Sequence, residues 1–279
     1  MLSSLFGLVS ALSWGAGDFA GGIVSRRAGA YRASFYGESA GLVFLSIMLA
    51  VTREPIPGWT SWAWSLAAGA AGAVGLVLLY RSLAEGQMSV AAPISALMAA
   101  VLPVIVSGLT EGLPGPLKYA GFALALLAVW LISQGEGHRK ELHLHLVDIW
   151  MPLLSGVCFG FYFILIHQGS RSATIWPMVA ARSAGSLVLF FFALANHQLS
   201  LPDRRTAPLV FLNAAGDIGG NTFYILAGQV GRLDVAAVLG SLYPGTTVLL
   251  AGLILHERLN RSQWIGILAA LTAIVLLTV

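Results

Sequence analysis

The chain has 279 residues, of which 57% are apolar and only 10% are charged, and its mean hydropathy is +0.83. A soluble globular domain carries about 25% charged residues, so this composition excludes an ordinary soluble protein as well as a disordered chain. The single cysteine, Cys158, excludes a disulfide framework and a site built from several cysteines. The net charge of +3 arises from residues in short connectors, which form no continuous basic patch for nucleic acid.

Apolar runs follow one another from one end of the chain to the other. Each is about 18 to 23 residues long, and about 20 apolar residues in a helix cross a hydrocarbon core roughly 30 Å thick. The runs cover residues 4–23, 33–51, 63–83, 88–109, 117–134, 149–167, 176–195, 207–229, 233–255 and 262–279. The sequence therefore predicts ten transmembrane helices and no soluble domain. The first run has no Lys or Arg ahead of it and is too long for a signal peptide, so we expect it in the mature protein.

The second half of the chain repeats the first. Offsets of 145 and 144 residues superpose Gly15 on Gly160, Val90-Ala91-Ala92 on Val235-Ala236-Ala237, and Ser39-Ala40-Gly41 on Ser183-Ala184-Gly185. Each half holds five runs, and an odd number of crossings makes the second copy enter the membrane from the opposite side. We therefore expect an all-α membrane protein of two inverted five-helix repeats around a central cavity. The repeats are residues 1–134 and 149–279, joined by a connector at 135–148.

Small residues and prolines occur inside these runs. Four Gly-x-x-x-Gly spacings begin at Gly17, Gly37, Gly156 and Gly216, and they favour close helix packing within one bundle over dimerisation. Pro93, Pro103 and Pro244 each remove a backbone hydrogen bond and can kink their helices, for gating or for architecture alone.

Four charged residues lie well inside the runs. They are Asp18, Glu38, Arg182 and Asp217. An unpaired charge in hydrocarbon costs about 2.5 to 3.5 kcal/mol, so each should face a cavity or a partner. The repeat superposes Glu38 on Arg182, which predicts either two charged positions of one cavity or a salt bridge that only holds the bundle together. Asp18 lines the cavity or extends toward Arg26 and Arg27 at the membrane surface.

Asp217 shares a helix face with two other polar residues. Asn221 and Tyr224 follow it at positions i+4 and i+7. We interpret this face as the wall of a substrate site, with packing as the alternative. Aromatic side chains could complete such a wall through cation–π contacts, and the candidates are Trp14, Phe19, Tyr80, Tyr224 and Tyr243.

Several motifs carry a family resemblance. They are Trp14-Gly15 with Asp18-Phe19, the stretch from Tyr80 to Gly86 leading to Ala92-Pro93-Ile94-Ser95-Ala96-Leu97, Ser241-Leu242-Tyr243-Pro244, and His256-Glu257-Arg258-Leu259 before Gln263-Trp264-Ile265-Gly266. With these motifs the whole chain resembles the EamA family of the drug/metabolite transporter superfamily. The resemblance implies a ten-helix basket that moves small metabolites by alternating access, and its motifs add Ser241 to the candidate substrate-binding residues. Thr110 departs from the family pattern, since it stands where Gly precedes the Glu at the end of the fourth helix.

The intramembrane charges constrain the substrate. Their sum has an excess of two negative charges, whereas a sugar phosphate would need several Arg or Lys. We expect a secondary-active transporter of an amino acid, an amine or a similar zwitterionic or cationic metabolite, proton-linked through Glu38 and acting as a monomer in the cell (inner) membrane. Its partners are then the substrate, the bilayer and protons, with no nucleic acid, cofactor or metal. The alternatives are an uncoupled facilitator, a lipid scramblase or an intramembrane enzyme, although the sequence has no phosphate-binding loop and no nucleophile–base pair.

The basic residues and the family resemblance predict opposite orientations in the membrane. Ten Lys and Arg residues fall in connectors on the side of the first loop and four on the other, which places the first loop in the cytoplasm by the positive-inside rule. The family resemblance instead implies cytoplasmic termini, and we expect a cytoplasmic C-terminus. The connector histidines His138, His143 and His145 fit a solvated loop better than a metal site.

Overall fold

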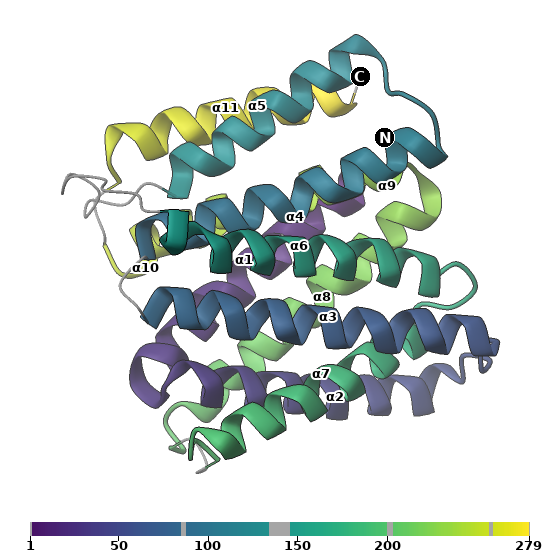
Figure 1. Cartoon of the computed structure of the whole chain (residues 1–279), viewed down its shortest axis with the longest axis vertical. Helices are drawn as coiled ribbons and strands as arrows, with labels where there is room; N and C mark the ends of the chain where they lie inside the picture. The colour runs from purple at the N-terminus through teal and green to yellow at the C-terminus, as the bar shows by residue number, and fades with distance from the viewer. Residues whose placement is uncertain (1, 85–87, 134–145, 200–202, 257–258, 279) are drawn as a thin grey trace.

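A computed structural model of the chain describes residues 2–84, 88–133, 146–199, 203–256 and 259–278. Within these residues every regular element is a helix (Figure 1). The helices are α1 Leu2–Ala28, α2 Ala30–Thr52, α3 Trp59–Ala84, α4 Met88–Thr110, α5 Pro116–Ser133, α6 Leu146–Gly169, α7 Ile175–Ala195, α8 Ala207–Val230, α9 Leu233–Gly240, α10 Tyr243–Ile254 and α11 Arg261–Thr278.

The ninth apolar run forms one candidate membrane span, as predicted, but its helix is interrupted, because the run is divided into α9 and α10. The break falls at Ser241 and Leu242. Pro244 lies in the first turn of α10, where its missing N–H costs no helical hydrogen bond. The Ser241 hydroxyl donates to the Val238 carbonyl at 2.7 Å and thereby satisfies an acceptor at the end of α9. By contrast, α4 continues through both of its prolines.

Length and composition qualify six segments of the described chain as membrane spans. They are Tyr31–Thr52, Trp59–Leu79, Pro116–Ser133, Trp150–Gly169, Ile175–Ala195 and Leu233–Ile254, the last including both α9 and α10. Two shorter apolar helices accompany them, Ile94–Thr110 and Arg261–Leu277. Large apolar side chains on the outside are strongly exposed, for example Leu109 at 83% and Val51 at 77%. An apolar exterior of this kind suits contact with lipid rather than water. The chain is therefore a multi-pass membrane protein.

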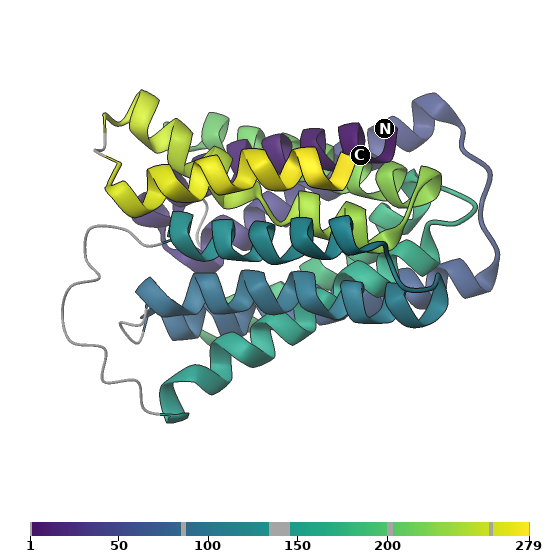
Figure 2. The same cartoon turned by 90° about the horizontal axis from the view of Figure 1, so that it is seen from above.

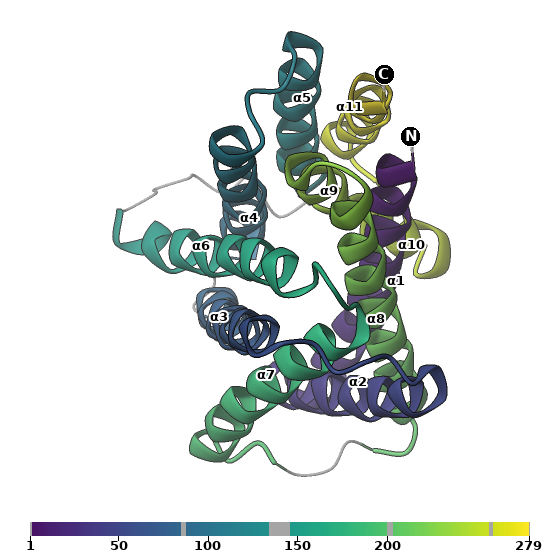
Figure 3. The same cartoon turned by 90° about the vertical axis from the view of Figure 1, so that its right-hand side faces the viewer.

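The helices run side by side in one bundle (Figure 1). Seen along the bundle, α5 and α11 form one extreme and α2 and α7 the other (Figure 3). Between them, α1, α8, α9 and α10 form one side, and α3, α4 and α6 form the other. The most extensive packing joins α1 to α8, α3 to α6, and α5 to α11, so helices of the first half pack mainly against helices of the second half.

The connections divide between the two ends of the bundle. Both termini lie at the same end, which we name the terminal end and which also carries the α2–α3, α4–α5, α6–α7 and α8–α9 connections (Figures 1 and 2). The opposite end, the basic end, carries the α1–α2 and α7–α8 connections. Among the described residues it holds more cations than the terminal end does. Those of the basic end are Arg26, Arg27, Arg32, Arg81, Arg204, Arg205 and Arg261.

Glycines bring the backbones of neighbouring helices together. A Cβ built on Gly216 of α8 would lie 2.6 Å from the Cα of Gly17 in α1, so these helices cross backbone to backbone. On the other side of the bundle, a Cβ on Gly156 of α6 would meet the Ser95 carbonyl of α4 at 2.5 Å, and one on Gly160 would meet Leu102. The glycine spacings read from the sequence thus act inside one bundle.

Candidate functional site

A charged centre lies where α2, α7 and α8 meet. Arg182 of α7 pairs with Glu38 of α2, with 2.9 Å between Nη1 and Oε2, and its Nη2 contacts Oδ2 of Asp217 in α8. The Arg182 side chain is 8% exposed, whereas those of Glu38 and Asp217 are 25% and 34% exposed. The cation is therefore enclosed, whereas both carboxylates remain partly exposed.

Two glycines of the repeated Ser-Ala-Gly sequence lie against this centre. A Cβ on Gly41 would lie 3.3 Å from the Arg182 guanidinium carbon, and a Cβ on Gly185 would lie 3.7 Å from Oε2 of Glu38. Gly41, three residues after Glu38, therefore faces Arg182, and Gly185, three residues after Arg182, faces Glu38. A Cβ at Gly41 would therefore be a tight contact for the Arg182 guanidinium, whereas one at Gly185 would be at ordinary contact distance from Glu38.

A chain of hydrogen bonds extends the centre along α8 to α6. The Asn221 amide donates to Oδ2 of Asp217 at 3.1 Å and to the Asp217 carbonyl at 2.8 Å. Its oxygen accepts the phenol hydrogen of Tyr162. Sequence reasoning missed Tyr162 because it stands in an apolar run with neither a charged neighbour nor a polar stripe. The centre thus joins four helices through ionic and hydrogen-bonding groups.

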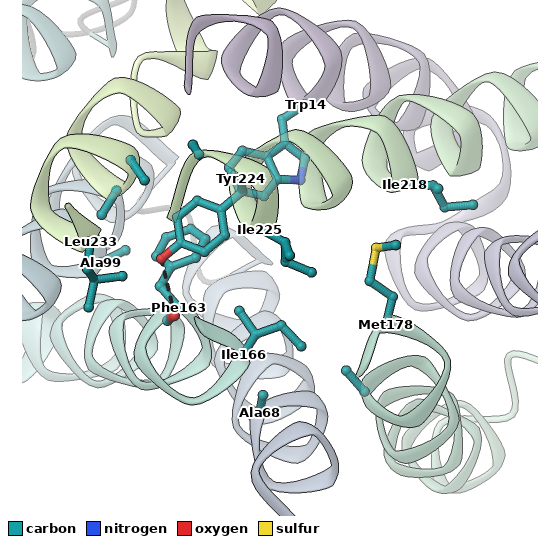
Figure 4. Close-up of a cluster of buried hydrophobic side chains, with 14 of the residues drawn as sticks. Trp14, Ala68, Ala99, Phe163, Ile166, Met178, Ile218, Tyr224, Ile225 and Leu233 are labelled. Atoms are coloured by element: carbon teal, nitrogen blue, oxygen red, sulfur yellow. Dashed lines mark hydrogen bonds between the residues drawn. The ribbon is translucent and has the colours of Figure 1, made fainter. Parts of the chain in front are cut away.

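Three of the predicted aromatic residues, Trp14, Tyr224 and Tyr243, belong to a separate cluster beside the charged centre. Trp14 packs against Tyr224 and Tyr243, with ring centroids 5.8 and 6.5 Å apart, and against Phe163 at 5.6 Å. Tyr224 is 1% exposed, and its hydroxyl donates to the Phe163 carbonyl at 3.2 Å (Figure 4). Tyr224 therefore lies on the Asp217 side of α8, as its spacing indicates, but its polar atom is bound to backbone in the core.

The remaining predicted residues are dispersed. Asp18 is exposed on α1, directly after the glycine that packs on α8, and forms no hydrogen bond or ion pair with the part of the chain that the structure describes. Ser241 is buried at the α9–α10 break, with its hydroxyl bound to backbone. Tyr80 belongs to α3, but its side chain lies outside the described residues, as do His138, His143 and His145.

Two polar contacts join the halves at the terminal end, away from the charged centre. The Glu54 carboxylate, in the α2–α3 connection, accepts the backbone N–H groups of Thr174, Ile175 and Trp176 at 2.8 to 2.9 Å. It thus satisfies the N-terminus of α7, where unpaired N–H groups and the helix dipole favour an anion.

The second contact surrounds Arg232, which donates to buried Asp234 at 2.8 to 3.1 Å and to the Gly112 carbonyl at 2.7 Å. Hydrogen bonding to Asp234 raises the pKa of the Arg232 guanidinium further above its ordinary value. This connection between α8 and α9 is thereby tied to the connection between α4 and α5.

An apolar helical bundle with charged, partly accessible groups between its halves has the architecture of a membrane transporter. The model of the EamA-like transporter family matches residues 1–134 and 146–279. The chain therefore belongs to this family, which is part of the drug/metabolite transporter superfamily.

Comparison with solved structures agrees on the fold. One solved structure, titled "Crystal structure of protein", superposes with a TM-score of 0.81 and 15% sequence identity. The match covers 99% of this chain and 96% of the chain in that structure. At that identity the likeness establishes the fold alone. No curated protein matches the sequence.

Proposed function

We propose that the chain is a secondary-active transporter of a small zwitterionic or cationic metabolite, such as an amino acid or amine, in the cell membrane. The observation that carries this proposal is the bridge from Arg182 to both Glu38 and Asp217. One guanidinium and two ionised carboxylates leave one negative charge. A substrate ammonium group would neutralise this charge, whereas a phosphate would add to it and would find the one guanidinium of the centre already engaged.

The accessible faces of the carboxylates support the same assignment. A substrate ammonium group would pair with Glu38 or Asp217 from the open side. A substrate carboxylate would compete for Arg182, and it would do so most easily when a proton neutralises one of the two acids. Asn221 and Tyr162 would then hold the Asp217 carboxylate in place during the exchange.

The same competition provides a route to proton coupling. If Arg182 binds both acids in one state, protonation of Glu38 weakens one of its two attachments, and α2 can separate from α7. Transport would then exchange a proton for the substrate at the same groups. Coupling and binding would share one centre, which is the simplest arrangement for alternating access.

The inverted repeat is the architectural part of the proposal, and the helix ends support it. Arg53 and His197 follow α2 and α7 with φ angles of 52° and 56°, and they are 144 residues apart. Gly112 and His256, with φ angles of 85° and 57°, follow α4 and α10 and are also 144 residues apart. Left-handed residues are uncommon outside glycine, so their recurrence at one offset does not result from apolar composition.

Helix packing supports the repeat as well. The pair of α1 and α8 corresponds to the pair of α6 and α3, while α2 packs on its counterpart α7 and α5 on its counterpart α11. A two-fold exchange of the halves accounts for all these pairs, and two copies that meet in this way can rock against each other.

Transport by the purified chain in proteoliposomes tests the proposal. Radiolabelled amino acids and primary amines serve as probes, with sugar phosphates as the contrasting class, each measured with and without a pH gradient. We expect movement of a zwitterionic or cationic probe that the gradient accelerates. Transport insensitive to the gradient would identify a facilitator, and movement of sugar phosphates alone would contradict the substrate class.

A further inference from the structure

The basic end of the bundle contains a pocket that the proposed transport cycle does not use. It lies between the α1–α2 turn and the connection from α7 to α8 and has a volume of about 470 Å³. The residues that line it are Arg27, Ala28, Arg32, Asp203, Arg205 and Thr206. Asp203 is the one acid in this lining of described residues, so the pocket carries an excess of two positive charges.

One of these arginines has an unsatisfied buried group. Nε of Arg32 is buried and has no hydrogen-bond partner in the described chain. A guanidinium N–H removed from water without an acceptor is costly, so an oxygen acceptor that reached it would be favoured. Arg27 and Arg205 are exposed and line the same pocket, so an anion bound there beside Arg32 would also meet their guanidinium groups.

The other half of the chain indicates that the fold does not need this pocket. The residue 144 positions after Arg32 is Trp176, and the residue 144 positions before Thr206 is Trp62. These two tryptophans pack together with ring centroids 5.3 Å apart. The positions of Arg32 and Thr206 at the basic end are therefore filled by two packed aromatic side chains at the corresponding corner of the terminal end.

The two corners also differ in charge at a second matched position, which is acidic at the terminal end and neutral at the basic end. Glu54 binds the α7 N-terminus, and the residue 144 positions later is the neutral Gln198. Gln198 lies beside Gly29 at the start of α2, and its Oε1 is buried without a partner in the described residues. The basic corner thus lacks the carboxylate of its counterpart while it gains arginines.

We propose that this pocket binds a phosphate group, carried either by an anionic lipid headgroup or by a free phosphate ion. Phosphate oxygens match the planar fork of a guanidinium, and several arginines around one phosphate give charge-assisted hydrogen bonds on more than one side. Basic pockets between transmembrane helices bind lipid headgroups in this way. The site lies at the end of the bundle, and its occupancy does not depend on which metabolite the centre transports.

Two binding arms distinguish the sources of phosphate. The full chain in detergent is mixed with phosphatidylglycerol or phosphatidylcholine, and bound lipid is counted by native mass spectrometry. In parallel, its unfolding temperature is followed in sodium phosphate and in sodium chloride of equal ionic strength. Preference for phosphatidylglycerol without a phosphate response identifies a headgroup site, whereas stabilisation by phosphate without lipid preference identifies a free anion.

Paired variants test the assignment to this pocket. The double variant Arg32→Gln with Arg205→Gln should weaken the affinity for the phosphate-bearing ligand by about tenfold or more, since a hydrogen bond to a charged group contributes about 1.5 to 3 kcal/mol. The control, Arg53→Gln with Arg171→Gln, removes the same charge at the terminal end and should bind as the native chain does. Asp203→Asn removes the acid of the pocket and should tighten binding. Equal binding by the native chain, the Arg32/Arg205 pair and Asp203→Asn overturns the proposal.

Discussion

The guanidinium of Arg182 lies 2.9 Å from the carboxylate of Glu38, and the two residues are 144 positions apart, the offset that relates the halves. In the proposed two-fold repeat, residues at matching positions that touch each other lie beside the axis that exchanges the two copies. An ion pair there is disturbed by any movement of one half against the other. This location makes the pair sensitive to rocking, which a salt bridge within one half would not be.

Removal of the cation should harm the protein more than removal of the pair. In Arg182→Ala, Glu38 and Asp217 remain close together without a counter-ion, which is the costly way to break an enclosed pair. We expect its unfolding temperature to fall by several degrees and transport to be lost. Arg182→Ala combined with Glu38→Gln should recover part of the thermal stability in a detergent melting assay. A double variant less stable than Arg182→Ala contradicts this interpretation.

The polar chain along α8 should be required for transport but not for abundance. Asp217→Asn removes one of the two acids that contact Arg182, and Asn221→Ala removes the amide that donates to Asp217. Tyr162→Phe removes the hydroxyl that binds Asn221. We expect each variant to reach the membrane at the native level and to transport severalfold more slowly. Thr222→Val is the matched control, because its hydroxyl bonds to Ile218 and Met178 instead. Native rates in all three test variants would exclude this chain from the site.

Glu54 should contribute to stability without taking part in transport. Glu54→Ala leaves three N–H groups of the α7 N-terminus without their acceptor and should cost about 1 to 2 kcal/mol. Gln198→Ala is the control at the corresponding corner, where Oε1 has no partner in the described residues. Thermal melting should therefore separate the two variants, while transport per folded molecule stays native in both. Equal melting temperatures would argue against the cap.

Helix contact through glycine gives a second test of packing. Gly216→Ala places a methyl group 2.6 Å from the Cα of Gly17, so α1 and α8 must separate and stability should fall by about 1 to 3 kcal/mol. Gly22→Ala, in α1 but with open space around the new methyl, should be neutral or stabilising by up to about 1 kcal/mol. The ratio of folded to aggregated protein after heating measures the stability of both variants. A stable Gly216→Ala variant would mean that the helices do not rely on this approach.

Helical segments were predictable because each apolar run has the length of a membrane span and charges lie at its ends. Glu38 and Arg182 could be matched from their shared Ser-Ala-Gly sequence, since the repeat aligns them before any coordinates are known. The break in the ninth run was harder to predict. A proline inside an apolar run is compatible with a kink, a stop or a continuous helix, and tertiary packing decides among them.

Side-chain roles were less predictable than positions. Tyr224 follows Asp217 and Asn221 on a polar helix face, whereas Tyr162 stands in an apolar run. Nevertheless, Tyr162 binds Asn221 at the charged centre, and Tyr224 binds a core carbonyl. The contacts of Arg232 and Glu54 depend on connectors that lie far apart along the chain. No periodicity within a single helix carries information about such partners.

Glu38 offers the most direct test of a proton-coupled charged centre. Glu38→Gln keeps the size of the side chain and one hydrogen-bonding oxygen for Arg182 but cannot release a proton. In proteoliposomes, we expect this variant still to bind substrate but to move it at the same rate with and without a pH gradient, whereas the gradient accelerates transport by the native chain. An unchanged acceleration in Glu38→Gln would contradict the assignment of proton coupling to this centre.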